Sequence, residues 1–174
     1  MDHFEADRHE CDIPLCKAII ALLGNEVKTA IDIGCGNGAY TKELRDRGID
    51  CAGYDGSPLT PELSNGLCGI MDFSEEVDLG EYDLALSLEV GEHIPQQYEQ
   101  VFIDNVCWSS KKYVILSWAV EGQGGMGHVN CRNNDYIIGE MEKRGFVFNE
   151  AFTNQLRSEI SLYWLKDTLM VFNL

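Results

Sequence analysis

The sequence predicts an α/β fold: a doubly wound, mostly parallel sheet with helices on both faces. From Ile13 to the C-terminal end, short apolar runs alternate with segments that have the spacing of amphipathic helices. Several of these runs carry too few polar residues to have a solvated face, which is typical of parallel strands buried on both sides. Repeats and low-complexity linkers are absent, so the 174 residues are expected to form a single domain.

The first half of the chain contains two expected helices and four expected strands. A helix is expected over residues 13–24, with Pro14 in its first turn and Gly24 after its end. Helix formers also fill residues 40–48, and Gly48 stops that helix. The apolar runs predict strands over residues 28–34, 50–56, 67–73 and 82–90.

The second half continues the alternation to the end of the chain. A helix is expected over residues 95–110, opened by its proline. A second helix over residues 134–145 can be capped by Asn133 or Asn134 at its start and by Gly145 at its end. The remaining elements are strands over residues 111–119, 146–149 and 169–174, with a mixed helical connection over residues 152–165.

The net charge of −16 is unevenly distributed along the chain. Residues 49–110 contain thirteen Asp or Glu and no Lys or Arg. Such a surface repels a phosphate backbone, so the charge argues against nucleic acid as a partner. The acidic residues either form a solvated face that keeps the protein soluble or attract a cationic small molecule.

Other bulk features concern the compartment and metals. No apolar run approaches the roughly 20 residues that span a membrane, and residues 1–12 are too acidic for a signal peptide, so a cytoplasmic protein without a membrane partner is expected. The seven cysteines are odd in number and scattered, which indicates reduced, packed thiols. Cys11 and Cys16 lie near His3 and His9, but their spacing matches no usual zinc pattern, so no metal site is predicted.

A glycine-rich turn follows the first expected strand. Gly34, Gly36 and Gly38 lie where the backbone must approach a ligand closely. Together with Ala39 they also satisfy the dinucleotide pattern G-x-G-x-x-G/A. Asp55 follows at the end of the second strand, where an acid that binds a ribose belongs. The turn therefore predicts a nucleoside site, whose ligand is either NAD or S-adenosylmethionine.

Three features favour S-adenosylmethionine. Asp32 lies two residues before the first glycine, and its carboxylate can hold the ammonium of an amino-acid cofactor or an ordered water. The third glycine, Gly38, gives the spacing G-x-G-x-G. Residues 71–73, MDF, supply an acid and an aromatic ring suited to the amino group and the face of adenine.

These segments resemble the class I methyltransferases that use S-adenosylmethionine. The similarity covers IDIGCGNG, GYDGS, MDF and LALSLEVGEHIP and extends through the last two strands. It implies a seven-stranded sheet in the order 3-2-1-4-5-7-6 with the last strand antiparallel. It also implies that Asp55 binds the ribose, that Asp72 and Phe73 lie near adenine, and that Glu89 lies beside the sulfonium. The cofactor-binding residues expected on this basis are Asp32, Gly34, Cys35, Gly36, Gly38, Asp55, Gly56, Ser57, Met71, Asp72, Phe73 and Glu89.

The end of the fourth strand, SLEVGEHIP, indicates which atom is methylated. It lacks the D/N-P-P-Y/F tetrapeptide of enzymes that methylate base amino groups and the Pro-Cys pair of pyrimidine carbon methylases. EVGEHI is instead similar to the EVxEHI segment of many small-molecule and glycan methyltransferases. His93 is therefore expected near the methyl group, where a neutral imidazole can take the proton of a hydroxyl. The alternative is a structural role, in which its ring bonds a backbone group where the next helix starts.

The loop over residues 121–130, EGQGGMGHVN, follows the fifth strand on the same rim. The string SWAxxGQGGxGHVN is similar to one in small viral and glycan-modifying methyltransferases, which implies a sugar or another polyol as acceptor. His128 is the second candidate base, Trp118 could form a wall for the acceptor, and Asn130 could bond its hydroxyls. Glu92 is also expected to contact the acceptor. The glycines would let the loop close as a flap; the alternative is a turn held by local bonds.

The predicted function is methylation of a hydroxyl on a small molecule or a glycan. Two alternatives are a nicotinamide-dependent oxidoreductase and a non-catalytic, cofactor-binding partner of an active methyltransferase. The acceptor is expected to be held by the glycine loop, by residues 152–164, and by residues 1–24 as a lid that includes Phe4 and His9. A partner domain or a second copy of the chain could complete the site.

Overall fold

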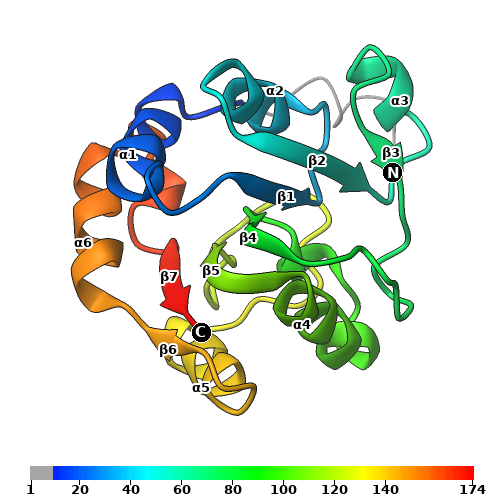
Figure 1. Cartoon of the computed structure of the whole chain (residues 1–174). Coiled ribbons are helices and arrows are strands. Elements are labelled where there is room, and N and C mark those ends of the chain that lie inside the picture. Colours follow the sequence, from blue (N-terminus) through cyan, green and yellow to red (C-terminus); the bar gives the residue numbers. More distant parts are fainter. Residues whose placement is uncertain (1–9) are drawn as a thin grey trace.

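The computed structural model describes residues 10–174 and arranges them around one seven-stranded sheet (Figure 1). The strand order is β3-β2-β1-β4-β5-β7-β6, as predicted. Strands β1 to β5 pair in parallel, and β7 is antiparallel to both of its neighbours, which confirms the predicted topology. The strands are β1 Thr29–Ile33, β2 Asp50–Asp55, β3 Gly69–Ile70, β4 Tyr82–Ser87, β5 Ser110–Leu116, β6 Val147–Phe148 and β7 Met170–Asn173.

Side chains of the central strands alternate between two hydrophobic cores, one on each face of the sheet. In β4, Leu84 and Leu86 belong to one core and Ala85 to the other. In β5, Ile115 joins the first core and Val114 the second. Because both faces are buried, these strands have no polar face, and this explains their continuous apolar sequence.

Helices cover both faces of the sheet, as predicted. Leu15 of α1 and Leu156 of α6 pack into the first core, which α2 also covers through Leu44. Phe102 of α4 and Ile137 of α5 pack into the second core. Figure 1 shows these helices against the sheet. The α-helices are α1 Ile13–Leu23, α2 Ala39–Asp46, α3 Thr60–Leu63, α4 Glu99–Trp108, α5 Asn134–Glu142 and α6 Glu150–Glu159. The 3₁₀ turns used below are η2 Gly91–His93, η3 Gln96–Tyr98 and η4 Tyr163–Leu165.

Asp12 ties the start of α1 to the segment between α6 and η4. Its Oδ1 caps the helix by accepting from the N–H of Leu15 at 2.9 Å. Its Oδ2 accepts from the N–H groups of Ser161 and Leu162 at 2.8 and 2.7 Å. This buried carboxylate therefore holds together two chain segments that are distant in sequence and that both reach the carboxyl ends of the strands.

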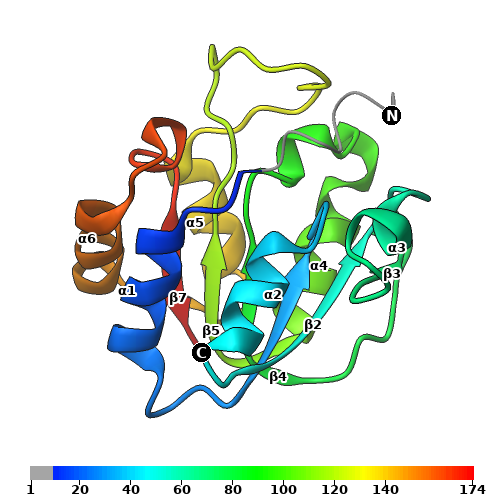
Figure 2. The ribbon, with the colours of Figure 1, turned by 90° about the horizontal axis from the view of Figure 1, so that it is seen from above.

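Several element boundaries differ from the sequence expectation. The third strand pairs with β2 only over Gly69–Ile70, and the expected 95–110 helix begins as η3 before α4. Asn133 occupies the N-cap of α5, but its side chain accepts from the N–H of Glu121 at 3.2 Å and not from its own helix. This bond joins the two ends of the long β5–α5 connection, which rises beyond the carboxyl end of β5 in Figure 2.

Over residues 10–174, no helix has the length and apolar character needed to cross a bilayer.

Candidate functional site

The turn between β1 and α2 has the backbone that its glycines predict. Gly34, Gly36 and Gly38 all have positive φ angles, of 79°, 56° and 77°. A Cβ on Gly34 would lie 2.3 Å from Val90, so the turn approaches the segment after β4 as closely as glycine allows. The N–H groups of Gly34 and Cys35 donate to the carbonyl of Tyr54 at 2.8 and 3.0 Å, which fixes the turn against β2.

Asp32 lies at the base of this turn and is almost completely buried. Only 3% of the residue is exposed, and Thr41 Oγ1 of α2 donates to its Oδ2 at 2.7 Å. Burial raises the pKa of Asp32 to about 7 because water no longer stabilises the charged form. A cationic ligand would favour the charged carboxylate and reverse this effect. Thr41 has no sequence signal of its own, since its contact depends on how α2 packs.

Asp55 at the end of β2 organises the same turn. Its Oδ2 accepts from the N–H of Gly36 at 2.8 Å, and its Oδ1 accepts from the N–H of Ser57 at 2.8 Å. The carboxylate is thus oriented by two backbone donors, and each oxygen retains a further lone pair for another donor. Its expected bond to a ribose stays a prediction. Gly56, between Asp55 and Ser57, is exposed.

The residues expected near adenine follow β3 and differ in how exposed they are. Phe73 is 4% exposed and packs in the second core, whereas Asp72 is exposed. Asp72 Oδ1 accepts from the N–H and Oγ of Ser74 at 2.9 and 2.6 Å, which lowers the pKa of its carboxyl. Met71 is half-buried, and its N–H donates to the Asp55 carbonyl at 2.9 Å. Asp72 can therefore meet a ligand, but Phe73 offers little of its ring.

A cavity of about 180 Å³ opens at the carboxyl ends of β1 and β4. The glycine turn contributes Asp32, Gly34 and Cys35 to its wall, and the segment after β4 contributes Glu89 and His93. The connection after α6 contributes Leu162, Trp164 and Leu165 and forms the third side, and Glu10 reaches the cavity from the N-terminal side. Whether this connection holds the acceptor stays a prediction. Phe4 and His9 lie outside the described residues. The lining residues of the described chain include no Lys or Arg.

Glu89 has a strained backbone at the rim of this cavity. Its φ of 55° lies in the left-handed region, which a non-glycine residue rarely adopts and which often marks a functional position. The side chain accepts from Gln123 Nε2 and from Thr168 Oγ1, each at 3.3 Å. Burial raises the pKa of the Glu89 carboxyl. Gln123 and Thr168 were not identified from the sequence because they reach Glu89 only through the folded loop and the segment between η4 and β7.

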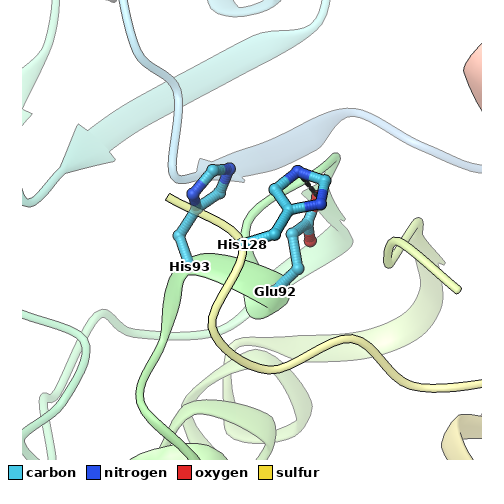
Figure 3. Close-up of side chains that lie close together, drawn as sticks. All are labelled: Glu92, His93 and His128. Atoms are coloured by element: carbon cyan, nitrogen blue, oxygen red, sulfur yellow. Dashed lines mark ion pairs between the residues drawn. The ribbon is translucent and has the colours of Figure 1, made fainter. Parts of the chain in front are cut away.

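Glu92, His93 and His128 form a compact cluster beside the cavity (Figure 3). Glu92 is fully buried, and its Oε1 lies 3.9 Å from His128 Nε2. Burial and the neighbouring Glu89 raise the pKa of Glu92 to about 8. The two imidazole rings are half-buried and nearly perpendicular, with centroids 5.1 Å apart. The structure therefore brings both predicted histidines together, although only His93 lines the cavity.

The loop over residues 121–130 is held against this cluster. The N–H groups of Val129 and Asn130 donate to the carbonyl of Glu92 at 2.8 and 3.0 Å. The Gly127 carbonyl lies 3.2 Å from His93 Nδ1, and the Gln123 carbonyl lies 3.2 Å from His128 Nδ1. The predicted location of the loop, on the same rim as His93, is confirmed. Its closure over an acceptor stays a prediction.

Trp118 and Asn130 do not lie where the sequence placed them. Trp118 is completely buried and packs edge-on against Phe102, so its ring is part of the core and forms no wall for an acceptor. A Cβ on Gly91 would lie 2.2 Å from the indole, which shows why η2 can pack so closely on it. Asn130 is 5% exposed and donates to Glu99 Oε2 at 2.9 Å. Both residues therefore stabilise the loop from inside.

Comparison with known proteins agrees with this architecture. The model of a family described as "Methyltransferase domain" matches residues 8–112, more than half of the chain. The probable chloroplastic tocopherol O-methyltransferase of Oryza sativa subsp. japonica is 29% identical over 105 residues, which are 52% of this chain and 29% of that protein. The matched part of the chain thus spans less than a third of this curated relative.

Solved structures share the fold at low sequence identity. CalS10, an amino pentose methyltransferase of Micromonospora echinaspora with bound S-adenosylmethionine, has a TM-score of 0.72 and 11% identity over 98% of this chain and 94% of that one. The magnesium protoporphyrin IX methyltransferase ChlM of Synechocystis PCC 6803, with the same cofactor bound, has a TM-score of 0.70 and 17% identity over 92% and 78% of the two chains. The small RNA methyltransferase HEN1 has a TM-score of 0.67 and 15% identity over 91% and 24%.

Proposed function

The chain belongs to the methyltransferase domain family, and we propose that it transfers the methyl group of S-adenosylmethionine to a hydroxyl of a small molecule or a glycan. The observation that carries this proposal is the cavity between the glycine turn and the end of β4. The carboxylates of Asp32 and Glu89 and the imidazole of His93 all line this cavity.

The charge of the cavity suits this cofactor. S-adenosylmethionine carries a sulfonium and an ammonium, and both are attracted by the carboxylates of Asp32 and Glu89. A nicotinamide dinucleotide carries a pyrophosphate, which needs donors or cations, and the described lining has no Lys or Arg. The electrostatics therefore favour the methyl donor over the alternative of an oxidoreductase.

The imidazoles suit a hydroxyl acceptor. In the transfer, the acceptor oxygen attacks the methyl carbon in line, the C–S bond breaks, and its electron pair stays on sulfur to give S-adenosylhomocysteine. The hydroxyl must also lose its proton. His93 lines the cavity and His128 lies beside it, so we place the hydroxyl against these two rings. Amines need no such help when they are already neutral, and this favours oxygen as the acceptor atom.

Cofactor binding is the first test. Thermal unfolding is measured with S-adenosylmethionine, S-adenosylhomocysteine and NAD, each at about 100 times its dissociation constant, where the expected stabilisation is about 2.7 kcal/mol. The two methionine-derived ligands should stabilise the protein and NAD should not. Stabilisation by NAD alone would refute the proposal.

The acceptor is tested by transfer of a labelled methyl group. The panel contains sugars, phenols and amines, together with a small RNA because HEN1 shares the fold. We expect label on hydroxyl compounds of low negative charge. Label on the RNA alone would show that the acidic surface does not exclude nucleic acid. Cofactor binding with no transfer to any acceptor would favour a non-catalytic partner.

A further inference from the structure

The cluster of Glu92, His93 and His128 has a use beyond that of a proton acceptor. Each of the three side chains offers one ligand atom, and these atoms all lie within 4.8 Å of one another. We propose that they form a binding site for a transition-metal divalent cation of the zinc, manganese and cobalt class. Its catalytic role rests on the proposed methyl transfer, but the binding itself does not.

Glu92 provides the main argument for a cation. The residue is fully buried, and neither carboxylate oxygen has a hydrogen-bond partner within residues 10–174. A buried carboxylate without a partner is costly, by several kcal/mol in real proteins. A bound cation would give these two oxygens the partner that they lack.

The spacing of the donors fits a shared ion. Glu92 Oε1 and His128 Nε2 are 3.9 Å apart, which is too long for a hydrogen bond. Two ligands that each lie about 2.0–2.2 Å from one tetrahedral ion are about 3.3–3.6 Å apart. Glu92 and His128 would therefore need to approach by a few tenths of an ångström, and no pair in the cluster would need to approach by more than about 1.5 Å from its present separation of at most 4.8 Å.

Both imidazoles are oriented by backbone carbonyls, as metal-binding histidines usually are. His128 Nδ1 lies 3.2 Å from the Gln123 carbonyl, and His93 Nδ1 lies 3.2 Å from the Gly127 carbonyl. When Nδ1 of His128 carries the proton, its Nε2, the atom nearest Glu92, presents a lone pair for a cation. A Cβ on Gly125 would lie 2.2 Å from His128 Nε2, so the glycine of the loop leaves room for this ring.

The rest of the loop holds the ligands in place. Two backbone N–H groups, from Val129 and Asn130, donate to the Glu92 carbonyl and join the loop to η2. Trp118 Nε1 donates to the Asn130 carbonyl at 2.6 Å inside the core. The buried positions of Trp118 and Asn130 thus have a functional consequence, because they fix His128 relative to Glu92.

The donor set selects the kind of cation. Two imidazoles and one carboxylate suit zinc and its neighbours, whereas magnesium and calcium prefer oxygen ligands. Three protein ligands also leave at least one position open, as in catalytic sites. His93 lines the cavity, so an open position can face an acceptor hydroxyl there. The cation would lower the pKa of that hydroxyl, whose proton then leaves to solvent as the oxygen attacks the methyl carbon.

The sequence pattern predicts no metal ligands, because these residues come together only through the topology of the sheet. His93 and His128 are 35 residues apart, on different connections of the sheet, and match no metal-binding pattern. They meet because β4 and β5 are neighbouring parallel strands, whose carboxyl ends lie at the same edge.

The test is calorimetric titration of the chelator-treated full chain with Zn²⁺, Mn²⁺, Co²⁺ and Mg²⁺ separately. We expect one equivalent of Zn²⁺ or Co²⁺ to bind, with Mg²⁺ at least 100-fold weaker, and Co²⁺ to give the visible absorption of a nitrogen-ligated site. Glu92→Gln, His93→Ala and His128→Ala should each weaken binding at least 10-fold. Glu121→Gln, a change to an exposed acid of the same loop, should leave it unchanged.

One further variant and one further measurement make the result decisive. The double variant His3→Ala, His9→Ala removes the chain's other histidines and should still bind the cation. Glu92→Gln should melt no lower than wild type without metal, because glutamine has nearly the same shape and Glu92 makes no hydrogen bond within residues 10–174 that it would lose, yet gain no stability when Zn²⁺ is added. The proposal is overturned if wild type binds none of these cations, or if the three cluster variants bind as wild type does.

Methyl transfer is measured separately from cation binding. Cofactor-dependent transfer that persists in chelator would refute the catalytic role of the cation and leave the proposed function standing. Cation binding at the cluster without any binding of S-adenosylmethionine would refute the proposed function and leave the metal site standing.

Discussion

The pKa of Asp32 makes cofactor binding dependent on pH in a defined direction. The free protein has an Asp32 pKa of about 7, raised from an ordinary 3.8 by burial. If the carboxylate pairs with the ammonium of S-adenosylmethionine, only the deprotonated form binds well. The affinity should therefore rise with pH up to about 7 and then level off, since Asp32 is already charged above that value.

The size of the pH effect on cofactor affinity follows from the raised pKa of Asp32. At pH 5, about two pH units below the pKa, deprotonation costs about 2.7 kcal/mol, so binding should be about 100-fold weaker than at pH 7.5. The folding equilibrium has the opposite sign. The folded pKa is above the unfolded one, so the unfolded chain loses its proton first and stability falls as pH rises from about 4 to about 7, by at most about 4 kcal/mol.

The perturbation is Asp32→Asn, which keeps an acceptor for Thr41 Oγ1 and removes the charge. Affinity is measured by calorimetry between pH 5 and 7.5, in buffers of different ionisation enthalpy that report proton release. Wild type should release close to one proton on binding at pH 5.5, and the variant should release one fewer. Glu10, Glu89 and His93 face the same cavity, so the difference between the two proteins isolates Asp32.

The control and the refuting result are both available from the same samples. Without cofactor, Asp32→Asn should be at least as stable as wild type at pH 7.5, which shows that any loss of affinity is not a loss of fold. Equal cofactor affinity and equal pH dependence in the two proteins would show that Asp32 does not hold the ammonium. The assignment of the cofactor's amino-acid end to this turn would then be wrong.

The remaining predictions concern the turn, the core and the histidines. In Gly34→Ala, the new Cβ would sit at a φ of 79° and 2.3 Å from Val90, so the variant should lose at least about 2 kcal/mol of stability and most of its cofactor affinity. Gly48→Ala is the control, because its φ of 91° is similar but the space around it is open. It should cost about 1–2 kcal/mol and leave the cofactor affinity, measured by calorimetry, unchanged. Trp118→Ala should lower the free energy of unfolding by about 3–5 kcal/mol in denaturant titration; a change below 1 kcal/mol would contradict its burial. His93→Ala should reduce kcat about 10²-fold or more while cofactor affinity changes less than 3-fold; an unchanged kcat would leave it a structural role.

The fold was predictable because its signals are local and mutually consistent. Buried strands such as β4 and β5 are continuous apolar runs, and each is followed by a helix pattern of its own. The strand order came from resemblance, since no local pattern states which strands are neighbours. The boundaries were less predictable: β3 was expected over seven residues and pairs over two, because hydrogen bonding to β2 and not apolar character decides where it ends.

The candidate site was predictable where one segment supplies the geometry. The glycine turn is such a segment, and its positive φ angles follow from the sequence. Trp118 and Asn130 were expected at the acceptor because they lie in or next to the loop, but whether such a side chain points into the core depends on the surface opposite it. For Trp118 that surface includes Gly91, whose missing side chain leaves the space that the indole fills.

The glycine loop shows how these two kinds of information combine. Its sequence predicts a mobile flap, yet in the structure the N–H groups of Val129 and Asn130, at its C-terminal end, donate to the carbonyl of Glu92 in η2. The stretch around Gly124, in contrast, is exposed and meets nothing within 4 Å of an added Cβ. If the loop closes over an acceptor, the movement must therefore come from the stretch around Gly124. The C-terminal part of the loop is bonded to η2, and Gly125 packs against His128, where an added Cβ would lie 2.2 Å from Nε2.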